Sequence, residues 1–320
     1  MQIEHLIRML KKKEFKGITC NSRDVGKGYI FIALKGSSYD GNKFIDEAVS
    51  RGAKAVVFAS DKLKGRSRGV YWVKVADARL SAARLASEFY GNPSGKIKVV
   101  GVTGTNGKTT VTYLLESILR EAGVKCGVIG TINYRFNNNV FPAGNTTPGA
   151  LDLQSFMQRL IKGGNSFLAM EVSSHALEQE RVGSINFHSA IFTNLTQDHL
   201  DYHKTMRNYF LAKLKLFKNL PRGAIAVLNR DDKYYPLIKK STKARIISYG
   251  FNPASMVRAV NIEYGLQGTH FDILFCGRAI KVSTSLIGRH NIYNILAASA
   301  WAYGARIGIK HIARAVNNFQ

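Results

Sequence analysis

A glycine-rich loop at residues 104–110, GTNGKTT, carries the residue types that hold the phosphates of a nucleotide. Glycines allow backbone N–H groups to approach phosphate oxygens, and the start of a helix favours negative charge. Lys108 adds a cation, and Thr109 adds a hydroxyl that can face Mg²⁺. The sequence therefore predicts a nucleoside triphosphate site made by Gly104, Thr105, Asn106, Gly107, Lys108, Thr109 and Thr110.

The elements on either side of this loop are those that such a site needs. An apolar strand over 97–104 leads into the loop, and a helix begins at once and ends at Gly123. The strict pattern G-x-x-x-x-G-K-[ST] would require glycine at Val102, so the loop is a variant. The alternative is a glycine-rich strand-to-helix turn that binds no nucleotide. The order of strand, loop, Lys-Thr pair and helix favours the phosphate site.

Composition limits what the rest of the chain can be. With 320 residues, 45% of them hydrophobic, the chain can bury a large core and should form two or more domains. The net charge of +25 would suit a nucleic-acid-binding protein, but the basic residues lie in separate segments such as KKKEFK, DKLKGRSR, KLKLFK and KKSTKAR. We interpret them as a solvated lysine-rich surface that also attracts anionic nucleotides, and we expect no nucleic-acid partner.

Neither a membrane nor a disulfide framework is predicted. No apolar run of about 18 residues exists, and the lysines near the start follow the short apolar stretch, the reverse of a secretory signal. We therefore expect a cytoplasmic protein without membrane insertion. The three cysteines Cys20, Cys126 and Cys276 lack the spacing of a zinc site, and we assign them no chemistry.

Apolar runs alternate with helical patterns along most of the chain. This alternation predicts an α/β fold: a small α/β domain over 1–93, a Gly/Pro/Ser-containing linker near 91–96, and a mostly parallel, doubly wound domain over 94–309. Residues 259–286 show no helical pattern and predict antiparallel hairpins in the second domain. Residues 310–320 are expected to begin a linker to a further domain.

The loop and five further segments together resemble the Mur ligases, the ATP-dependent amide-forming enzymes that build the peptide of bacterial peptidoglycan. The segment 21–57, from NSRDVGKGY onward, resembles the family's uridine-nucleotide-binding opening, with Asn21 where Asp is usual. Three segments are similar to those of the family branch that adds the third residue of the peptide: NTTPGALDLQ, EVSSHALEQERV and NLTQDHLDYHKTMRNYFLAKLKLF. GRHNIYNILAASA resembles the adenine-side motif, with His290 where an aromatic residue such as Phe is common. The related folylpolyglutamate synthases would not be expected to carry the NSR, NTTP or SSHAL segments.

The resemblance implies roles for residues that the pattern alone would leave as ordinary surface groups. It implies that ATP binds with two Mg²⁺ ions and that Lys108 contacts the phosphates. The implied Mg²⁺ ligands are Thr109, Glu171, His199 and a carbamate that CO₂ forms on Lys213. Lys215, on the same helix, is the lysine without a role. His203 lies four residues after His199, but no third nitrogen or sulfur ligand supports a zinc site. Asn291 and Asn294 are implied on the adenine side.

For the acceptor, the resemblance implies nucleotide or sugar contacts from Ser22, Asn145, Thr146, Thr147, Ser173, Gln179 and Arg181. Hydroxyls, amides and one guanidinium suit a diphosphate sugar that carries a peptide carboxylate. The implied reaction transfers the γ-phosphoryl group of ATP to the D-glutamate carboxylate of UDP-MurNAc-L-Ala-D-Glu, and the amine of a diamino acid then attacks the acyl phosphate. The resemblance therefore implies a role in peptidoglycan biosynthesis, and so in cell shape and cell division.

One departure from the family leaves alternatives open. Family members have a third, C-terminal domain, and this chain stops where the linker to it should begin, so we expect a fragment of a longer protein; a naturally shortened protein is the alternative. Two other functions stay open: a non-catalytic nucleotide-binding protein of the same fold, and a basic nucleic-acid-associated P-loop ATPase. The residues that would choose diaminopimelate or lysine cannot be identified.

Overall fold

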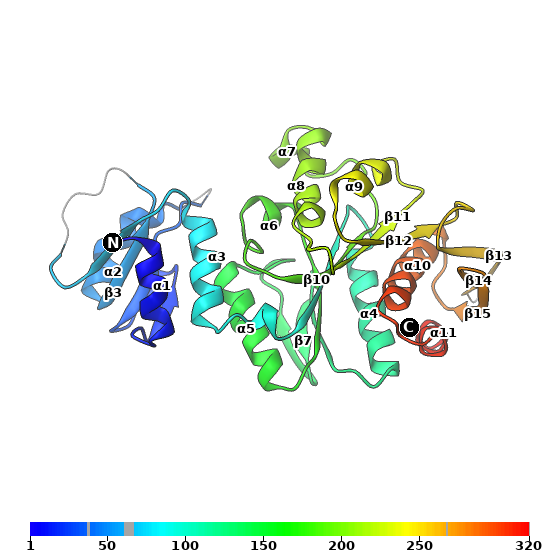
Figure 1. Ribbon diagram of the computed structural model, residues 1–320, viewed down its shortest axis with the longest axis horizontal. Coiled ribbons are helices and arrows are strands. Elements are labelled where there is room, and N and C mark those ends of the chain that lie inside the picture. Colours follow the sequence, from blue (N-terminus) through cyan, green and yellow to red (C-terminus); the bar gives the residue numbers. More distant parts are fainter. Residues whose placement is uncertain (37–38, 61–66, 267, 320) are drawn as a thin grey trace. The chain divides into compact units, whose positions relative to one another are not determined.

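The computed structural model describes residues 1–36, 39–60, 67–266 and 268–319 (Figure 1). It contains two compact units: unit 1 is Met1–Pro93, Gly149–Gln158 and Gln179–Ile185, and unit 2 is Ser94–Pro148, Arg159–Glu178 and Asn186–Gln320. Parts of three predicted segments lie outside the described residues: 37–38 of the nucleotide-binding opening, 61–66 of one basic segment, and 320 of the expected linker. Unit 1 is thus built from three stretches of chain, whereas the sequence predicts one.

Unit 1 is a parallel sheet covered by helices on both faces. Its strands run in the order β1 (Gly17–Thr19), β2 (Tyr29–Ile32), β3 (Ala53–Phe58) and β4 (Tyr71–Lys74). Side chains alternate along β2, so Ile30 and Ile32 join one core and Phe31 joins the other. The first core is completed by α1 (Ile3–Lys11) and α3 (Ala78–Phe89), and the second by α2 (Ile45–Ser50). The short helices η1 (Ser22–Asp24) and η2 (Gly41–Phe44) lie in its loops.

Unit 2 is organised by one long mixed sheet. The strand order is β15-β14-β13-β12-β11-β10-β5-β9-β6-β7-β8. The strands from β13 to β6 in that order are parallel, and an antiparallel hairpin extends each end. The strands are β5 (Lys98–Thr103), β6 (Cys126–Ile129), β7 (Asn133–Phe136), β8 (Asn139–Pro142), β9 (Phe167–Glu171), β10 (Phe187–Phe192), β11 (Ile225–Asn229), β12 (Arg245–Gly250), β13 (Val257–Gly265), β14 (Gly268–Phe275) and β15 (Arg278–Thr284). The predicted α/β class, the mostly parallel sheet and the hairpins over 259–286 are confirmed.

The helices are α4 (Lys108–Glu121), α5 (Ala150–Lys162), α6 (Ser174–Glu178), α7 (Leu200–His203), α8 (Met206–Lys218), α9 (Tyr235–Ser241), α10 (Arg289–Gly304) and α11 (Ile309–Asn317), with the 3-10 turn η3 (Pro93–Gly95) at the start of unit 2. Residues 150–158 of α5 belong to unit 1, and the rest of the helix belongs to unit 2. In the described part of the chain, no helix is long and apolar enough to cross a membrane.

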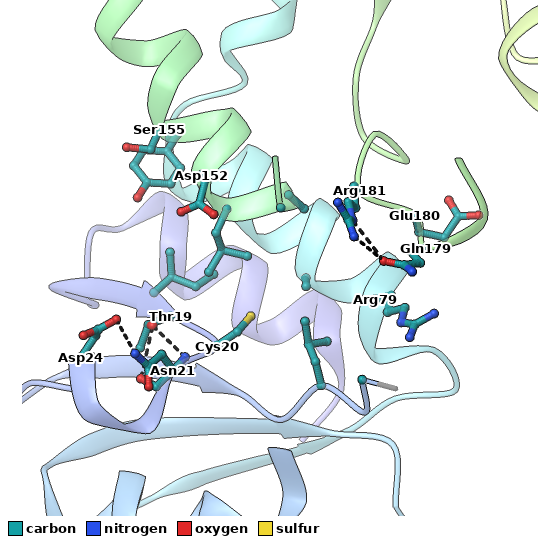
Figure 2. Close-up of a pocket in the computed structure, with 18 of the residues that line it drawn as sticks. Thr19, Cys20, Asn21, Asp24, Arg79, Asp152, Ser155, Gln179, Glu180 and Arg181 are labelled. Carbon is teal, nitrogen blue, oxygen red and sulfur yellow. Dashed lines mark hydrogen bonds between the residues drawn. The ribbon is translucent and has the colours of Figure 1, made fainter. Parts of the chain in front are cut away.

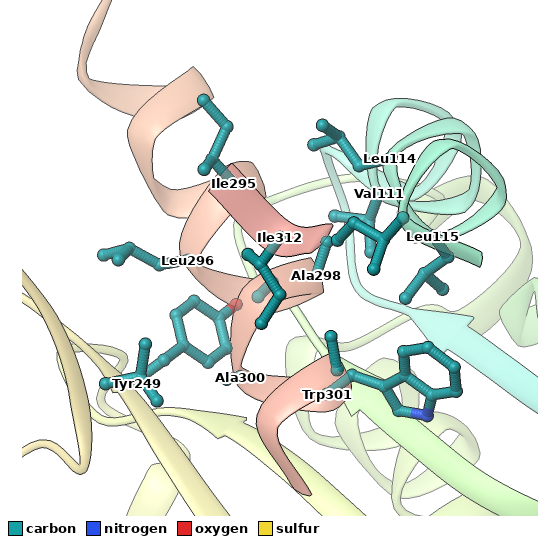
Figure 3. Packing of buried hydrophobic residues seen from close by; sticks show 14 of the residues in the cluster. Val111, Leu114, Leu115, Tyr249, Ile295, Leu296, Ala298, Ala300, Trp301 and Ile312 are labelled. Atoms are coloured by element: carbon teal, nitrogen blue, oxygen red, sulfur yellow. The ribbon is translucent and has the colours of Figure 1, made fainter. Parts of the chain in front are cut away.

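The largest core of unit 2 lies where α4, α10 and α11 meet the sheet (Figure 3). Leu114 and Leu115 of α4 face Ile295 and Trp301 of α10, and all four are fully buried. The indole N–H of Trp301 donates to Ser189 Oγ at 3.0 Å, so this large side chain is buried without an unpaired polar atom. Close packing on α10 fixes the position of α4, and therefore of the phosphate loop at its start.

The expected linker at 310–320 is wrong for most of its length. These residues form α11 and the turn after it, and Ile312, Ala315 and Val316 are buried in the same core. The apolar residues recur at helical spacing, so one face of α11 removes hydrocarbon from water by packing on α4 and β15. A segment that carries part of a core belongs to unit 2.

The strand order fixes where a ligand can bind in unit 2. β5 lies between β9 and β10, and the chain leaves β5 for one side of the sheet and later returns to the other side. Parallel doubly wound sheets bind ligands outside the carboxyl ends of their strands at such a switch point. The glycine-rich loop follows β5, Glu171 ends β9, and Asn194 follows β10, so all three lie at this edge.

Candidate nucleotide and acceptor sites

The glycine-rich loop has the backbone geometry of a phosphate cradle. It joins β5 to α4, and Gly104 and Gly107 have φ values of 147° and 85°, a region that residues with a Cβ rarely adopt. A Cβ on Gly107 would also collide with Oδ1 of Asn294 on α10. The predicted adenine-side helix therefore packs directly against the loop.

A cavity of about 250 Å³ opens beside the loop. Within unit 2 it is lined by polar and charged residues: Thr105, Asn106, Gly107, Lys108, Thr109, Thr131, Thr146, Glu171, Ser173, Ser174, His199 and Lys213. Gly104 and Thr110 were predicted with the loop but are not among the lining residues. The structure thus brings most of the predicted phosphate and metal residues to one small polar cavity.

Lys108 lies in the loop with its ammonium group held by loop carbonyls. Its Nζ donates to the carbonyl oxygens of Thr105 and Gly104 at 2.6 and 3.1 Å. Burial lowers the pKa of Lys108, and the nearby carboxylates of Glu171 and Asp198 partly offset this effect. The side chain of Lys108 therefore lies in the loop and lines the cavity beside it.

Glu171 is fully buried, and the described residues donate three hydrogen bonds to its carboxylate. Its Oε1 accepts from Thr109 Oγ1 and from the backbone N–H of Thr131, both at 2.8 Å, and its Oε2 accepts from Thr131 Oγ1 at 3.1 Å. A Cβ on Gly130 would collide with this carboxyl group, so a larger residue there would displace the Glu171 side chain. The acid at the end of β9 is thereby joined to the phosphate loop.

Lys213 and Lys215 lie on the same helix, α8, in opposite environments. Lys213 is 2% exposed, its Nζ donates to Gly104 O at 2.8 Å, and it lies 4.5 Å from the ring centre of Tyr209. Burial lowers the pKa of Lys213 well below its usual value, and the positive charge of Lys108 lowers it further. The Lys215 ammonium lies 3.3 Å from Glu178, and its side chain is 40% exposed. Helical periodicity turns one lysine inward and leaves the other in solvent.

His199 and His203 also differ. His199 has φ 51° at the start of α7, lines the cavity, and has its Nε2 3.5 Å from Asp198 Oδ2. His203 is buried, and its Nε2 lies 2.9 Å from Ser174 Oγ. Burial lowers the pKa of His203 and His175 adds to the effect. Among the described residues, no group of three or more His, Cys, Asp and Glu side chains is placed to hold a metal ion; of the predicted ligands, only Glu171 and His199 are of these types.

Four of the predicted acceptor residues lie at or near the same cavity. Thr146 and Ser173 line it, and Thr146 Oγ1 is 3.0 Å from Thr131 Oγ1. Thr147 is buried beneath, with its hydroxyl donating to Glu171 O at 2.8 Å. Asn145 is exposed, and its backbone N–H donates to the Tyr134 hydroxyl at 3.2 Å.

The other predicted acceptor residues lie in unit 1, which has a cavity of about 710 Å³ (Figure 2). Gln179 and Arg181 line it, and Arg181 donates to Gln179 Oε1 through Nε and a terminal nitrogen, at 3.1 and 2.7 Å. Arg79 also lines it and donates to Lys35 O at 3.0 Å. Ser22 is buried and is not among the lining residues, and its hydroxyl donates to Glu47 Oε2 at 2.7 Å, so its contact with the acceptor stays a prediction.

Asn291 and Asn294 form one hydrogen-bonded pair on α10. Asn294 Nδ2 donates to Asn291 Oδ1 at 3.3 Å, and Asn291 Nδ2 donates to Ile287 O at 2.9 Å. Neither lines the cavity beside the loop, but Asn294 contacts Gly107. Both amides are therefore placed by the first turn of the helix.

Sequence reasoning missed three residues at this edge of the sheet: Thr131, Asn194 and Tyr209. Asn194 Oδ1 accepts from the N–H of Asn106 at 3.0 Å, and the Tyr209 hydroxyl lies 3.3 Å from Thr105 Oγ1. Thr131 and Asn194 each follow a short apolar strand, and that position was the available signal, because parallel strands end at one edge. Tyr209 had no comparable signal.

Comparison with known proteins agrees with this geometry. Residues 102–302 match the family model described as Mur ligase middle domain, and residues 14–90 match that described as Mur ligase family, catalytic domain. The UDP-N-acetylmuramoyl-L-alanyl-D-glutamate--2,6-diaminopimelate ligase of Geobacter sulfurreducens is 43% identical over 97% of this chain and 63% of its own length. The ligase of the same name from Aquifex aeolicus is 42% identical over 95% of this chain and 62% of its own length.

A solved structure gives the same result. The structure titled UDP-N-acetylmuramoyl-L-alanyl-D-glutamate--2,6-diaminopimelate ligase superposes with a TM-score of 0.84 and 29% identity, covering 96% of this chain and 63% of that one. The chain thus spans about three fifths of the length of the relatives it matches. The family models alone account for most of both units, and the chain belongs to the Mur ligase family.

Proposed function

We propose that this chain contains the nucleotide-binding and acceptor-binding parts of an ATP-dependent ligase of peptidoglycan biosynthesis. The reaction would add a diamino acid to UDP-MurNAc-L-Ala-D-Glu through an acyl phosphate. The curated relatives are named for 2,6-diaminopimelate, which makes it the first diamino acid to test. We assign the UDP-sugar role to the 1–93 region and the ATP role to 94–309.

The observation that carries this proposal is the hydrogen bond between Thr109 Oγ1 and Glu171 Oε1 at 2.8 Å. It joins the first turn after a phosphate cradle to a buried acid at the end of the neighbouring strand. A hydroxyl and a carboxylate in this arrangement are the oxygen ligands of Mg²⁺ at a nucleotide phosphate. Together with Lys108, they fit ATP better than a glycine-rich turn without a ligand.

We propose that two Mg²⁺ ions bind, with Thr109, Glu171, His199 and a carbamylated Lys213 as the residues that hold them. Bound Mg²⁺ would neutralise charge on the phosphates. Lys213 fits its role because CO₂ adds to an unprotonated amine, and burial lowers the pKa of Lys213 well below its usual value. Asn291 and Asn294 would face the adenine.

The residues of the chain would act mainly by positioning and by charge. Gly104 to Thr110 would hold the phosphates through backbone N–H groups, and Lys108 would stabilise the transferred phosphoryl group. A carboxylate oxygen of the acceptor attacks the γ-phosphorus and ADP leaves; the amine of the diamino acid then attacks the acyl carbon and phosphate leaves. Gln179 and Arg181, in unit 1, and Asn145, Thr146, Thr147 and Ser173, in unit 2, would bind the acceptor.

A direct test supplies the 320-residue chain with ATP, Mg²⁺, UDP-MurNAc-L-Ala-D-Glu and 2,6-diaminopimelate or lysine, and detects UDP-MurNAc-tripeptide by mass spectrometry. Product formation would establish the activity for this length of chain. Binding of both nucleotides without product, in this chain and in a longer one that includes any following sequence, would favour the non-catalytic nucleotide-binding protein.

Lys108→Ala should abolish ATP binding measured by calorimetry and leave binding of the UDP-sugar within about twofold, because the cation is lost from one site only. Lys215→Ala is the matched control, since it removes an exposed lysine from the same unit. Unchanged ATP affinity in Lys108→Ala would contradict the assignment of the loop.

A further inference from the structure

A chain of two hydroxyl groups links the predicted acceptor segment to Glu171. Thr146 Oγ1 lies 3.0 Å from Thr131 Oγ1, and Thr131 Oγ1 lies 3.1 Å from Glu171 Oε2. The backbone N–H of Thr131 holds the other carboxylate oxygen at 2.8 Å. Thr131 follows β6 and has no place in the predicted site, yet it contacts both the acid and the acceptor segment.

The chemistry of these groups determines which hydroxyl donates and which accepts in each hydrogen bond. A carboxylate only accepts hydrogen bonds, and a hydroxyl has one hydrogen to donate. The single hydrogen of Thr131 must therefore point to Glu171, since otherwise two acceptor oxygens would face each other at 3.1 Å. Thr131 can then only accept from Thr146, so the hydrogen of Thr146 points to Thr131.

This direction determines what Thr146 can recognise. With its hydrogen engaged, Thr146 Oγ1 presents only lone pairs to the cavity that it lines with Lys108 and Thr109. We propose that Thr146 accepts a hydrogen bond from an N–H group of the acceptor, the amide that joins L-Ala to D-Glu, and that Thr131 is the positioning residue that fixes this polarity. The proposal rests on the proposed function.

The location of the cavity selects the peptide end of the acceptor. Lys108 and Thr109 line the same space, so the acceptor group nearest to Thr146 is the one beside the transferred phosphoryl group. The reacting carboxylate has no hydrogen to donate when ionised, and the neighbouring amide has one. Phosphate and carboxylate oxygens would be repelled by the lone pairs of Thr146, so the hydroxyl chain discriminates between donor and acceptor groups.

Thr131→Val tests the role of the two hydroxyl groups. Valine keeps the shape of the threonine side chain and the backbone N–H but removes the hydroxyl. Affinity for UDP-MurNAc-L-Ala-D-Glu, measured by calorimetry, should fall about three- to tenfold, as for the loss of one hydrogen bond at a solvent-accessible site. ATP affinity should change by less than about twofold, because Glu171 keeps two of its donors. Thr131→Ser should bind like the wild type.

Three further measurements make the assignment specific. In a Thr146→Val background, Thr131→Val should cause no further loss, since the two hydroxyls act as one unit. An acceptor analogue with an ester in place of the L-Ala–D-Glu amide lacks the N–H group, so wild type and Thr131→Val should bind it alike. Thr269→Val, which removes a buried hydroxyl elsewhere in unit 2, should leave both affinities unchanged.

The possible failures are distinct. If the wild type binds ATP but no UDP-MurNAc-L-Ala-D-Glu, the proposed acceptor is wrong and this inference falls with it. If the wild type binds both ligands and Thr131→Val does too, with unchanged affinities, the hydroxyl chain has no role in recognition. Equal losses in Thr131→Val and Thr131→Ser would also overturn the inference, because the hydroxyl would not be the cause.

Discussion

Lys213 shows how burial changes what a lysine can do. In water its amine would be protonated at neutral pH, but in unit 2 it is almost fully enclosed and lies near a second cation, Lys108. At any pH below the pKa of free lysine, a lower pKa means that a larger fraction of the Lys213 amine is unprotonated. A larger fraction of neutral amine favours the addition of CO₂ at Lys213.

The carbamate on Lys213 can be tested with ¹³C-labelled bicarbonate and carbon NMR. We expect one carbamate signal in the wild type at about pH 8, the same signal in Lys215→Ala, and none in Lys213→Ala. The signal should weaken as the pH falls, because protonation removes the reacting amine. A signal that persists in Lys213→Ala would assign the carbamate to another group.

Gly107 is a position in the loop where a side chain is poorly tolerated. Gly107→Ala would place a Cβ against Asn294 Oδ1 at a φ of 85°, so both the loop and α10 would have to move. We expect ATP affinity to fall by at least about tenfold, measured by calorimetry. Gly223→Ala is the matched control, since a Cβ there meets nothing within 4 Å. Equal ATP affinity in both variants would contradict a cradle at Gly107.

At the scale of elements, α11 is part of unit 2. Its sequence follows Gly308 at the N-cap and contains apolar residues at helical spacing. Only the contact with α4 and β15 shows that this apolar face is used in the core. The strand and the helix on either side of the phosphate loop are more regular, and the sequence predicts both to within a few residues.

Ile312→Ala should lower the free energy of unfolding by about 2–5 kcal/mol, because it leaves a cavity in a fully buried position. Urea denaturation followed by circular dichroism would measure the change. Lys310→Ala, on the exposed face of the same helix, should have an effect below about 0.5 kcal/mol. Equal stability of the two variants would mean that α11 does not pack in solution.

Other elements could not be predicted from local pattern. The strands β7 and β8 are only four residues long and have intermediate or exposed residues at most positions, so neither has the run of buried apolar residues that marks a core strand. Its pairing with β6 depends on contacts with the edge of the sheet. Thr131 precedes this hairpin, which explains why its contact with Glu171 was also missed.

At the scale of the whole molecule, charge is the dominant feature. The chain has 46 Lys and Arg residues against 21 Asp and Glu residues, and such an excess destabilises the folded state by self-repulsion. Exposed ion pairs such as Arg84–Glu4 offset little of this repulsion. Salt should therefore stabilise the fold until the repulsion is screened.

We expect the melting temperature to rise by a few degrees between about 10 and 150 mM NaCl, a range over which the Debye length falls from about 30 to 8 Å. Differential scanning fluorimetry would measure it, with sucrose as an uncharged control. A melting temperature that does not change with NaCl would mean that the charges are already balanced locally. A large rise with sulfate alone would indicate a bound anion instead of screening.

The sequence by itself determined the class of fold, the phosphate loop and the family resemblance, because each depends on residues that are close together in the chain. The glycine-rich loop between a strand and a helix is such a local pattern. The tertiary structure alone decided the division of unit 1 into three stretches, the burial of α11, the hydrogen bond from Ser22 to Glu47, and the link from Thr146 through Thr131 to Glu171. These features depend on contacts between distant segments, and such contacts leave no periodic trace in the sequence.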